Sequence, residues 1–372
     1  MEGLLKFMKK SVKPNSIIKN IKEIRDQTIL KRKKFTSDQL NKPVSFWIKD
    51  DRLLNEKGKE FTIILRTKGC SWALSDSGGC SMCGYINDSS IENIDDKHII
   101  NQVNHAFQSK LEEIRNEGKN FILKIFNSGS FFDESEISEE VRNHIYQKVY
   151  ESDNIEEFVI ESRLEYISKM KLIDLKNQLN DKYIELAIGL ETVNDYIRNA
   201  YINKGMFYDD FIKVFRICKE IGIGVRVYLL FKSPFLNEQG AIDDCVKSII
   251  NLVNLGVDTI SINPINIQKG TLLEYLWYQN RYRPPWFYSL FKSLRKIHKS
   301  KKDSIFPRLI SDPSGAGTKR GIHNCLKREC NQKMINILRN FVLSQDFNYL
   351  NKKDAYYDCD CLTRYRLQKN FH

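Results

Sequence analysis

The segment FTIILRTKGCSWALSDSGGCSMCGY (residues 61–85) joins a β-type run to a loop that is rich in glycine and cysteine. Its first six residues are mostly apolar or β-branched, which predicts a buried strand. The loop holds Cys70, Cys80 and Cys83 in a C-x9-C-x2-C pattern. Glycines between these cysteines allow the backbone to bend around a bound group. We therefore take this strand as the start of the fold and this loop as the first candidate for a functional site.

Similar strand patterns recur further along the chain, and amphipathic helical patterns separate them. We expect strands at 61–66, 121–127, 157–162, 183–191, 224–231 and 258–264. Strands that alternate with helices predict an α/β fold with a parallel sheet. Six such units are fewer than the eight of a closed TIM barrel, so the sequence predicts a partial, open (β/α)6 barrel.

The two ends of the chain differ from this pattern. We expect residues 1–45 to form a basic helical extension and residues 46–285 to form the barrel. Residues 286–372 contain a lysine-rich helix, a glycine-rich loop and a cysteine-containing end, which we expect to form a C-terminal module.

Positive charge is concentrated in two segments. The 372 residues carry a formal net charge of +12. Residues 1–50 hold 13 Lys/Arg against 5 Asp/Glu, and residues 292–328 hold 11 against 2, so the rest of the chain is net negative. This distribution favours a polyanionic partner such as RNA. Solvated helix faces that bind nothing are the alternative.

The composition also indicates a compartment. No apolar run reaches the length of about 18 residues that a membrane helix needs. The N-terminal residues lack the apolar stretch of a secretory signal, so we expect a cytoplasmic protein with no membrane partner. Nine cysteines in a reducing compartment favour metal binding or catalysis over disulfides.

The three cysteines of the loop suit a soft metal or an iron–sulfur cluster. A structural zinc site needs a fourth ligand, and no other cysteine precedes Cys218. Functional groups of parallel barrels lie after the strand ends, where this loop begins. We therefore expect a [4Fe–4S] cluster with one open iron, and three structural cysteines are the alternative.

A three-cysteine loop after the first strand of such a barrel resembles the radical S-adenosylmethionine (SAM) superfamily. The gap of nine residues departs from the commonest C-x3-C-x2-C spacing and is similar to the gap in the Elongator catalytic subunit family. Four further segments resemble, in order, the archaeal radical SAM subunit of archaeosine synthase: residues 159–167, 188–206, 228–244 and 261–290. The resemblance covers about residues 45–330.

The resemblance implies a radical SAM barrel that holds a [4Fe–4S] cluster and SAM, and that generates a 5′-deoxyadenosyl radical. In that family the radical cleaves a lysine adduct of 7-cyano-7-deazaguanine at position 15 of tRNA, which leaves archaeosine. It also implies three partners: tRNA, the enzyme that attaches the lysine, and an electron donor.

The resemblance further suggests cofactor-binding residues after the other strands. Ser128, Gly129 and Ser130 occupy the place of a motif that binds the amino group of the methionine moiety. Glu161 and Arg163 follow the third strand, where Arg163 is a candidate partner for a carboxylate. A strand-end turn and a Glu161–Arg163 surface pair are the alternatives.

Later strands add further candidates. Glu191 is a candidate ligand of ribose hydroxyls, and an ion pair with Arg198 or Lys204 is its alternative. Candidates for contacts with adenine follow the last predicted strand, where an Asn-Pro turn is the alternative: Asn263, Asn266 and Gln268. Lys232 is a candidate contact of phosphate or substrate, although a lone lysine is more often exposed.

The remaining cysteines fall into two groups. Cys218 and Cys245 lie on apolar helix faces, which predicts core positions. The other four lie in the last 48 residues as C-x4-C and C-x-C pairs: Cys325, Cys330, Cys359 and Cys361. This set predicts either an all-cysteine zinc site or four free thiols, and a second iron–sulfur cluster is less favoured.

Two other functions remain open at this point. One is a different radical SAM modification of tRNA, such as carboxymethylation or methylthiolation. Methylthiolation would need a second cysteine cluster upstream, and residues 1–69 contain no cysteine. The other is a zinc-dependent RNA-binding protein without catalysis.

Overall fold

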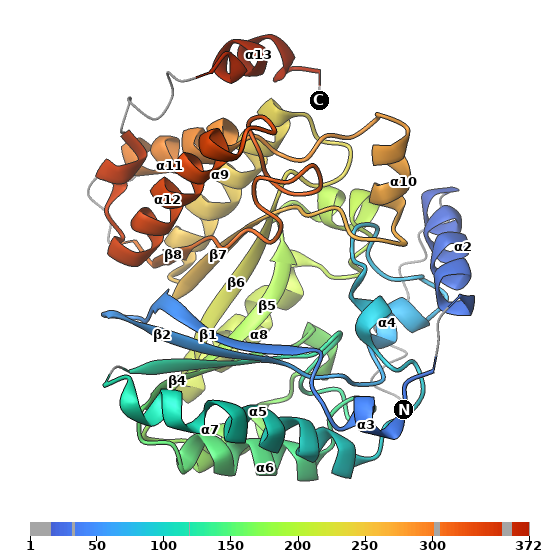
Figure 1. Ribbon diagram of the computed structural model, residues 1–372, viewed down its shortest axis with the longest axis vertical. Helices are drawn as coiled ribbons and strands as arrows, with labels where there is room; N and C mark the ends of the chain where they lie inside the picture. Colours follow the sequence, from blue (N-terminus) through green and yellow to red (C-terminus); the bar gives the residue numbers. More distant parts are fainter. Residues whose placement is uncertain (1–15, 32–33, 119, 301–305, 352–358, 372) are drawn as a thin grey trace.

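The computed structural model describes residues 16–31, 34–118, 120–300, 306–351 and 359–371 (Figure 1). Residues 1–15 of the expected N-terminal extension and residues 301–305 of the second basic segment lie outside these ranges. Within the described residues, no helix is both long and apolar enough to cross a membrane.

One curled sheet of eight strands follows the order of the chain, β1 to β8. β1 pairs with β2 in antiparallel register, and every later pair is parallel. The strands are β1 (Ser45–Arg52), β2 (Lys57–Ile64), β3 (Phe121–Phe126), β4 (Ile155–Glu161), β5 (Tyr183–Glu191), β6 (Gly224–Phe231), β7 (Thr259–Pro264) and β8 (Arg308–Ile310).

Helices cover the outer face of this sheet, and three lie near the loops that follow the strands. Figure 1 shows α2, α4 and α10 gathered at one end of the sheet. The helices are α2 (Ser16–Leu30), α3 (Ser37–Leu40), α4 (Ser71–Leu74), α5 (Asp96–Asn116), α6 (Glu139–Tyr150), α7 (Lys169–Gln178), α8 (Tyr208–Ile221), α9 (Glu238–Leu255), α10 (Leu272–Tyr278), α11 (Phe287–Ser300), α12 (Arg328–Ser344) and α13 (Cys361–Gln368). Short helical turns are η1 (Tyr85–Asp88), η2 (Leu164–Tyr166), η3 (Ile197–Tyr201) and η4 (Phe347–Asn351).

The six strands predicted from the sequence are all present, in an α/β sheet that curls as an open barrel. Two further strands, β1 and β8, were not predicted. β1 carries Lys49, Asp50, Asp51 and Arg52, which suggest a surface loop, and no helix separates it from β2. β8 has only three residues, too few to show a pattern, and it extends the sheet into the segment that we expected to form a separate module.

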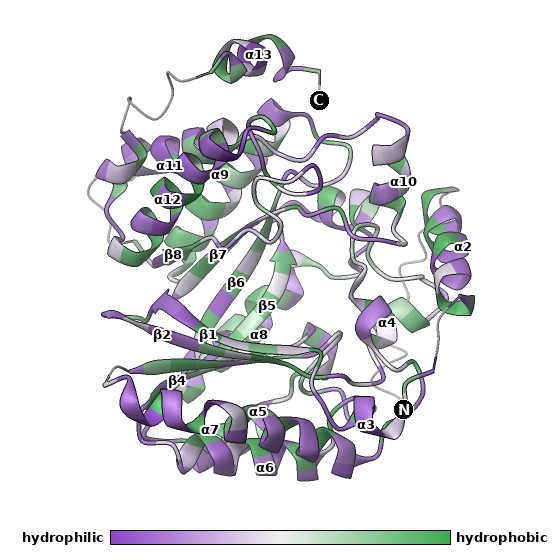
Figure 2. Ribbon diagram, in the orientation of Figure 1, coloured by the Kyte–Doolittle hydropathy of each residue, from purple (hydrophilic) through white to green (hydrophobic). Residues whose placement is uncertain are grey.

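Alternate residues of each strand face two different environments, because side chains alternate across a strand. One set is apolar and packs under the helices, as Ile63, Leu123 and Phe158 do. Cys218 of α8 and Cys245 of α9 are buried in this layer, which confirms the predicted core positions. Figure 2 shows hydrophobic residues on the helix sides that face the sheet.

The other set lines the inner face of the sheet and is partly charged. Lys124 of β3 pairs with Asp51 of β1 at 2.5 Å and also with Glu60 of β2. Glu185 of β5 pairs with Arg226 of β6 at 2.6 Å. These side chains are almost fully buried, so buried ion pairs as well as apolar contacts connect the strands on the inner face.

Arg308 of β8 connects the two edges of the sheet across this inner face. Its Nη1 donates to Glu157 Oε2 at 2.7 Å and to the carbonyl oxygen of Arg52 at 3.1 Å, and its Nη2 donates to Glu185 Oε2 at 2.8 Å. Only 4% of Arg308 is exposed. One side chain therefore links β8 to β1, β4 and β5 across the inside of the curled sheet.

Candidate functional site

The cysteine loop follows β2 at the end of the sheet where the parallel strands terminate. It contains the single-turn helix α4 and ends in the turn η1. Gly69, Gly78 and Gly79 have φ values of +100°, +70° and +83°, a region that favours glycine. A Cβ at Gly78 would lie 2.8 Å from the Cα of Lys22, so the loop packs directly on the backbone of α2.

Two side chains from distant parts of the chain hold this loop. Arg25 of α2 donates from Nε to the carbonyl of Gly78 at 3.0 Å and from Nη2 to the carbonyl of Cys83 at 2.6 Å. Asn203 donates from Nδ2 to the carbonyls of Ser77 and Gly79, both at 2.9 Å. The backbone of the loop is therefore held in place by two side chains, and the cysteine side chains remain available to bind a group.

Replacing Arg25 by alanine should loosen the loop without unfolding the barrel. Hydrogen bonds from a charged donor contribute about 1.5–3 kcal/mol each, and this side chain makes two of them to the loop. We expect faster amide hydrogen exchange in residues 69–85 and little change in the strands. Lys22→Ala on the same helix is the control, because Lys22 pairs with Asp26 across one turn of α2. Equal exchange in both variants would show that Arg25 does not brace the loop.

The three thiols lie close enough to influence one another. Removal from bulk water raises the pKa of Cys70 to about 11 and that of Cys83 to about 12. The charge of Cys80 contributes to both increases in pKa, and Arg25 opposes the increase at Cys83. Such thiols release their protons when a cationic centre takes their place. Three thiols in one glycine-rich loop, near enough for their charges to interact, thus fit the ligand set of an iron–sulfur cluster.

Charged residues from the next strands surround the thiols. Glu191, at the end of β5, pairs with Lys204 at 2.8 Å, as one of the alternatives for Glu191 predicted. Glu191 and Cys80 together outweigh the cost of burial and raise the pKa of Lys204. Burial raises the pKa of Glu161 to about 7, although Lys204 opposes the rise. A buried carboxyl group that titrates near neutral pH is typical of a functional site.

The turn after β3 is held from within the protein. Ser128 Oγ donates to the carbonyl of Tyr85 at 3.1 Å, and Ser130 Oγ accepts from the backbone N–H of Arg163 at 3.1 Å. A Cβ at Gly129 would lie 1.7 Å from Glu136 Oε1, so only glycine fits there. Both hydroxyl groups therefore position neighbouring loops.

Glu136 organises the same turn and was not among the sequence candidates. It accepts hydrogen bonds from Thr67 Oγ1 at 2.8 Å, Asn127 Nδ2 at 2.9 Å and the N–H of Ser130 at 2.9 Å. Burial raises its pKa to about 7, and these hydrogen bonds lower it. Glu136 thereby ties the turn after β3 to the start of the cysteine loop.

Arg163 lies over the face of Trp72 from the cysteine loop, with 5.0 Å between the guanidinium carbon and the ring centroid. Its Nε donates to Glu165 Oε1 at 2.5 Å, so its carboxylate partner within the chain is Glu165 and not Glu161. The side chain is 8% exposed and lies near Cys70 and Cys80, whose charges favour its cationic form.

Residues after β7 contact the cysteine loop at one point. Gln268 Oε1 accepts a hydrogen bond from the backbone N–H of Gly84. Asn266 instead donates to Ser314 Oγ at 3.4 Å in the glycine-rich loop that follows β8. Asn263 Oδ1 accepts from Ser261 Oγ at 3.1 Å. Gln268 is thus the member of this trio that the structure brings to the cysteines.

Lys232 is neither exposed nor turned towards a ligand. Only 1% of it is exposed, and its Nζ pairs with Glu238 Oε1 at 2.6 Å and donates to the carbonyl of Arg283 at 2.7 Å. It links the end of β6 to α9 and to the segment before α11. The sequence suggested a contact or an exposed side chain because Lys-Ser-Pro resembles a surface turn.

Several residues at this site were missed from the sequence: Arg25, Tyr85, Glu136 and Asn203. Tyr85 follows the last cysteine of the loop and exposes 55% of its surface beside the thiols. Asn203 has a φ of +61°, and asparagine before Lys-Gly is a signal for this conformation. Arg25 lies in a basic segment whose charge suggests an RNA-binding surface. That interpretation gave no indication that Arg25 contacts the cysteine loop.

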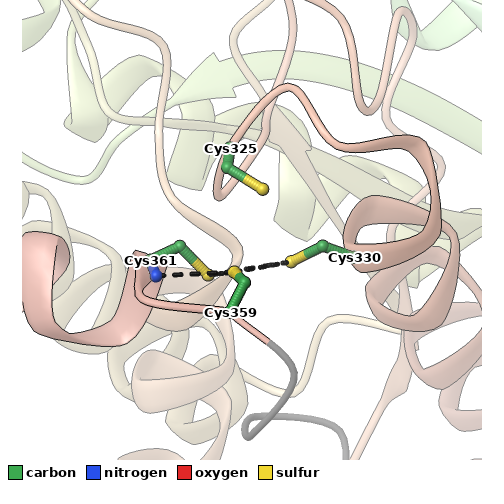
Figure 3. Close-up of side chains that lie close together, drawn as sticks. All are labelled: Cys325, Cys330, Cys359 and Cys361. Carbon is green, nitrogen blue, oxygen red and sulfur yellow. Dashed lines mark hydrogen bonds between the residues drawn. The ribbon is translucent and has the colours of Figure 1, made fainter.

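The last four cysteines converge at a second place (Figure 3). Their sulfur atoms all lie within 4.8 Å of one another. Two of the cysteines lie before or in the first turn of α12, and the other two lie before or at the start of α13. The group lies beside the apolar cluster of Trp286, Tyr288 and Tyr365. It shares no residue with the cysteine loop after β2.

Comparisons with known proteins identify relatives over most of the chain, although no family model matches it. An uncharacterised protein of Methanocaldococcus jannaschii is 39% identical over 92% of this chain and 90% of its own length. Archaeosine synthase subunit beta of Methanosarcina acetivorans is 37% identical over 93% of this chain and 94% of its own. The subunit of the same name in Thermococcus kodakarensis is 38% identical over 82% of this chain and 92% of its own length.

A solved structure similar to this chain is queuine lyase from Clostridium spiroforme, bound to SAM and queuine, at 23% identity and a TM-score of 0.43. The match covers 62% of this chain and 90% of that one. The two archaeosine synthase subunits each match this chain over more than nine tenths of their own length. The family expected from the sequence is thereby confirmed: this chain belongs to the archaeosine synthase subunit beta family.

Proposed function

We propose that this chain is a radical SAM enzyme that modifies tRNA. The observation that carries the proposal is that Cys70, Cys80 and Cys83 share one loop at the end of the barrel, near enough for their charges to interact with one another and, at Cys80, with Lys204. Membership of the archaeosine synthase subunit beta family supports the same activity and substrate.

In this proposal the thiolates of Cys70, Cys80 and Cys83 would hold a [4Fe–4S] cluster. Such a cluster, once reduced, would supply the electron for the reductive cleavage of SAM to methionine and a 5′-deoxyadenosyl radical. Arg25 and Asn203 keep the loop backbone fixed, so that the sulfurs stand ready for the metal. Trp72 covers one side of Arg163.

Charged side chains then position SAM and the substrate. Arg163 uses Nε for Glu165, and we propose that its Nη groups bind a carboxylate, as guanidinium groups commonly do. The pair of Glu191 with Lys204 offers a carboxylate to ribose hydroxyls and an ammonium group to an anion. Further cofactor contacts are proposed for the backbone of Ser128, Gly129 and Ser130, and for Glu161, Asn263, Asn266 and Gln268.

The substrate in this proposal is the lysine adduct of 7-cyano-7-deazaguanine at position 15 of tRNA. Cleavage of a C–N bond of the lysine side chain leaves the formamidine group of archaeosine. The enzyme that attaches the lysine would be the partner subunit, and an external donor would reduce the cluster. The reaction takes place where tRNA is modified, in the cytoplasm.

A surface pocket next to the C-terminal segment supports binding of a nucleic acid. Its volume is about 510 Å³. The lining combines aromatic rings with cationic groups, as proteins that stack unpaired bases do: Trp277, Tyr278, Asn280, Tyr282, Arg283, Pro284, Lys319, His323, Leu326 and Gln368. We propose that part of the tRNA docks here, with residues 46–285 as the catalytic unit and 286–372 as the binding module.

Neutralising the exposed cations near this pocket should weaken tRNA binding in a salt-dependent way. In the triple variant Lys319→Gln, Lys327→Gln and Arg328→Gln, we expect the slope of log K against log salt to fall. The decrease should be roughly 0.7–0.9 for each lost phosphate contact. Filter binding at several salt concentrations measures this slope.

Three exposed lysines on α7 and α8 provide a control with the same loss of charge: Lys169, Lys213 and Lys219, each replaced by glutamine. Their removal should leave the slope unchanged. Equal slopes for both triple variants would place the tRNA elsewhere on the protein.

One experiment tests the activity directly. The protein is reconstituted without oxygen, reduced, and incubated with SAM and tRNA that carries the lysine adduct. Nucleoside mass spectrometry should then show archaeosine, and 5′-deoxyadenosine should form with it. A colourless protein that binds tRNA but cleaves no SAM would instead support a binding protein without catalysis. 5′-Deoxyadenosine without archaeosine would retain the radical chemistry and assign it to another tRNA modification.

A further inference from the structure

The second cysteine group brings together two stretches of the chain, residues 325–330 and 359–361. Cys325 lies in the loop before α12, and Cys330 lies in the first turn of α12. Cys359 lies just before α13, and Cys361 is its first residue. Figure 3 shows the four side chains pointing towards one region between these segments.

The distances between the sulfur atoms match a single tetrahedral metal ion. A Zn–S bond of about 2.3 Å places sulfurs at the corners of a tetrahedron about 3.8 Å apart. Cys330 Sγ lies 3.7 Å from Cys361 Sγ and 3.7 Å from Cys359 Sγ. Cys359 and Cys361 are closer, at 2.7 Å, and would separate by about 1 Å around an ion.

Polar and cationic groups lie beside these sulfur atoms. Tyr288 Oη lies 3.0 Å from Cys361 Sγ, and the backbone N–H of Cys361 donates to Cys359 Sγ at 3.4 Å. Hydrogen bonds of this kind orient metal ligands and stabilise their charge. Cys330 and Cys361 lie in the first turns of helices, where the helix dipole favours negative charge. Arg283 adds a cation near Cys325 and Cys361.

We propose that Cys325, Cys330, Cys359 and Cys361 bind one structural zinc ion. Binding of Zn²⁺ releases four thiol protons and leaves a centre of net charge −2, without oxidation or reduction. A four-iron cluster would occupy more space between its sulfur ligands than these distances allow. The site is independent of the proposed catalysis, because none of its ligands belongs to the cysteine loop after β2.

The zinc ion would fasten the end of the chain to the rest of the protein. Within the described residues, α13 packs on a small cluster in which Trp286, Tyr288 and Tyr365 are buried. Tyr365 Oη also accepts from Ser289 Oγ at 3.2 Å, and Asn237 Nδ2 donates to the carbonyl of Asn370 at 3.0 Å. A metal would join α13 to α12 and to the loop before α12, and would hold Gln368 in the lining of the pocket that we propose for tRNA.

The test uses the full-length protein and compares the two cysteine groups. Elemental analysis of the wild-type protein should find about one zinc per chain in addition to iron. X-ray absorption at the zinc edge should show four sulfur ligands at about 2.3 Å. Cys330→Ser should lose the zinc and retain the iron, whereas Cys83→Ala should lose the iron and retain the zinc. Hydrogen exchange in α13 should rise only in Cys330→Ser.

Three outcomes would overturn the proposal. Wild-type protein with iron alone, and more than four irons per chain, would assign a second cluster to these cysteines. Protein without zinc that fails to take it up from a zinc buffer would leave four free thiols. Denaturing alkylation that finds these cysteines oxidised would indicate disulfides. The wild-type measurements decide the question even if Cys330→Ser fails to fold.

Discussion

Replacing Cys83 by alanine should abolish iron binding and reduce the cleavage of SAM to background. In our proposal each of Cys70, Cys80 and Cys83 supplies one of three thiolates, and two thiolates hold a four-iron cluster poorly. The barrel should still fold, because the loop lies beyond the strand ends and its backbone is fixed by Arg25 and Asn203. Iron content, visible absorption and the yield of 5′-deoxyadenosine after reduction measure the effect.

Cys218→Ala is the matched control, because it removes a cysteine from the core and leaves the loop intact. It should lower stability and retain iron. Normal production of 5′-deoxyadenosine by Cys83→Ala would exclude the radical mechanism at this loop. Unchanged circular dichroism would show that any loss of activity does not come from unfolding.

Replacing Arg308 by alanine should lower the free energy of unfolding by about 3–5 kcal/mol, because it leaves the buried Glu157 without a cation and removes one of the two cations that pair with Glu185. Glu157 and Glu185 would both lose an ion pair, at 2.7 and 2.8 Å, and the carbonyl of Arg52 would lose a donor. Total stabilities of about 5–15 kcal/mol are usual, so the loss is a large fraction. The midpoint of urea unfolding measures it.

Arg339→Ala provides the comparison. Arg339 also reaches from the C-terminal part of the chain to β1, where it pairs with Asp50 at 2.7 Å, but it is 61% exposed. An exposed pair of this kind contributes about 0–1 kcal/mol. If both variants unfold at the same urea concentration, the inner layer of charges does not stabilise the barrel.

Much of the fold could be predicted from the sequence, because strand and helix periods differ. The six long strands all lay where the apolar runs predicted them, and the family was recognised from ordered motifs. β1 and β8 were missed for physical reasons: β1 ends in four consecutive charged residues, which suggest a surface loop, and β8 is too short to show alternation. Pairing across the sheet, rather than local preference, creates both strands.

The candidate site was predicted less completely. Cysteine spacing identified the loop, since three thiols that cluster between glycines are typical of a metal centre. The residues that hold the loop could not be predicted, because they are distant from it in the sequence. Arg25 lies 53 residues from Gly78, and Asn203 lies 124 residues from Gly79. Buried charges such as Lys232 and Arg308 look like surface residues in a sequence, and only their partners reveal that they are internal.

The order of the strands has a consequence for the growing chain on the ribosome. Because β1 to β8 are arranged in order of synthesis, each strand can add to the edge that the previous one leaves. Arg308, however, lies 123 residues after Glu185 and 151 residues after Glu157. The nascent sheet therefore carries carboxylates whose final counter-ion has not yet emerged, and β8 completes the barrel as a late, electrostatic closing step.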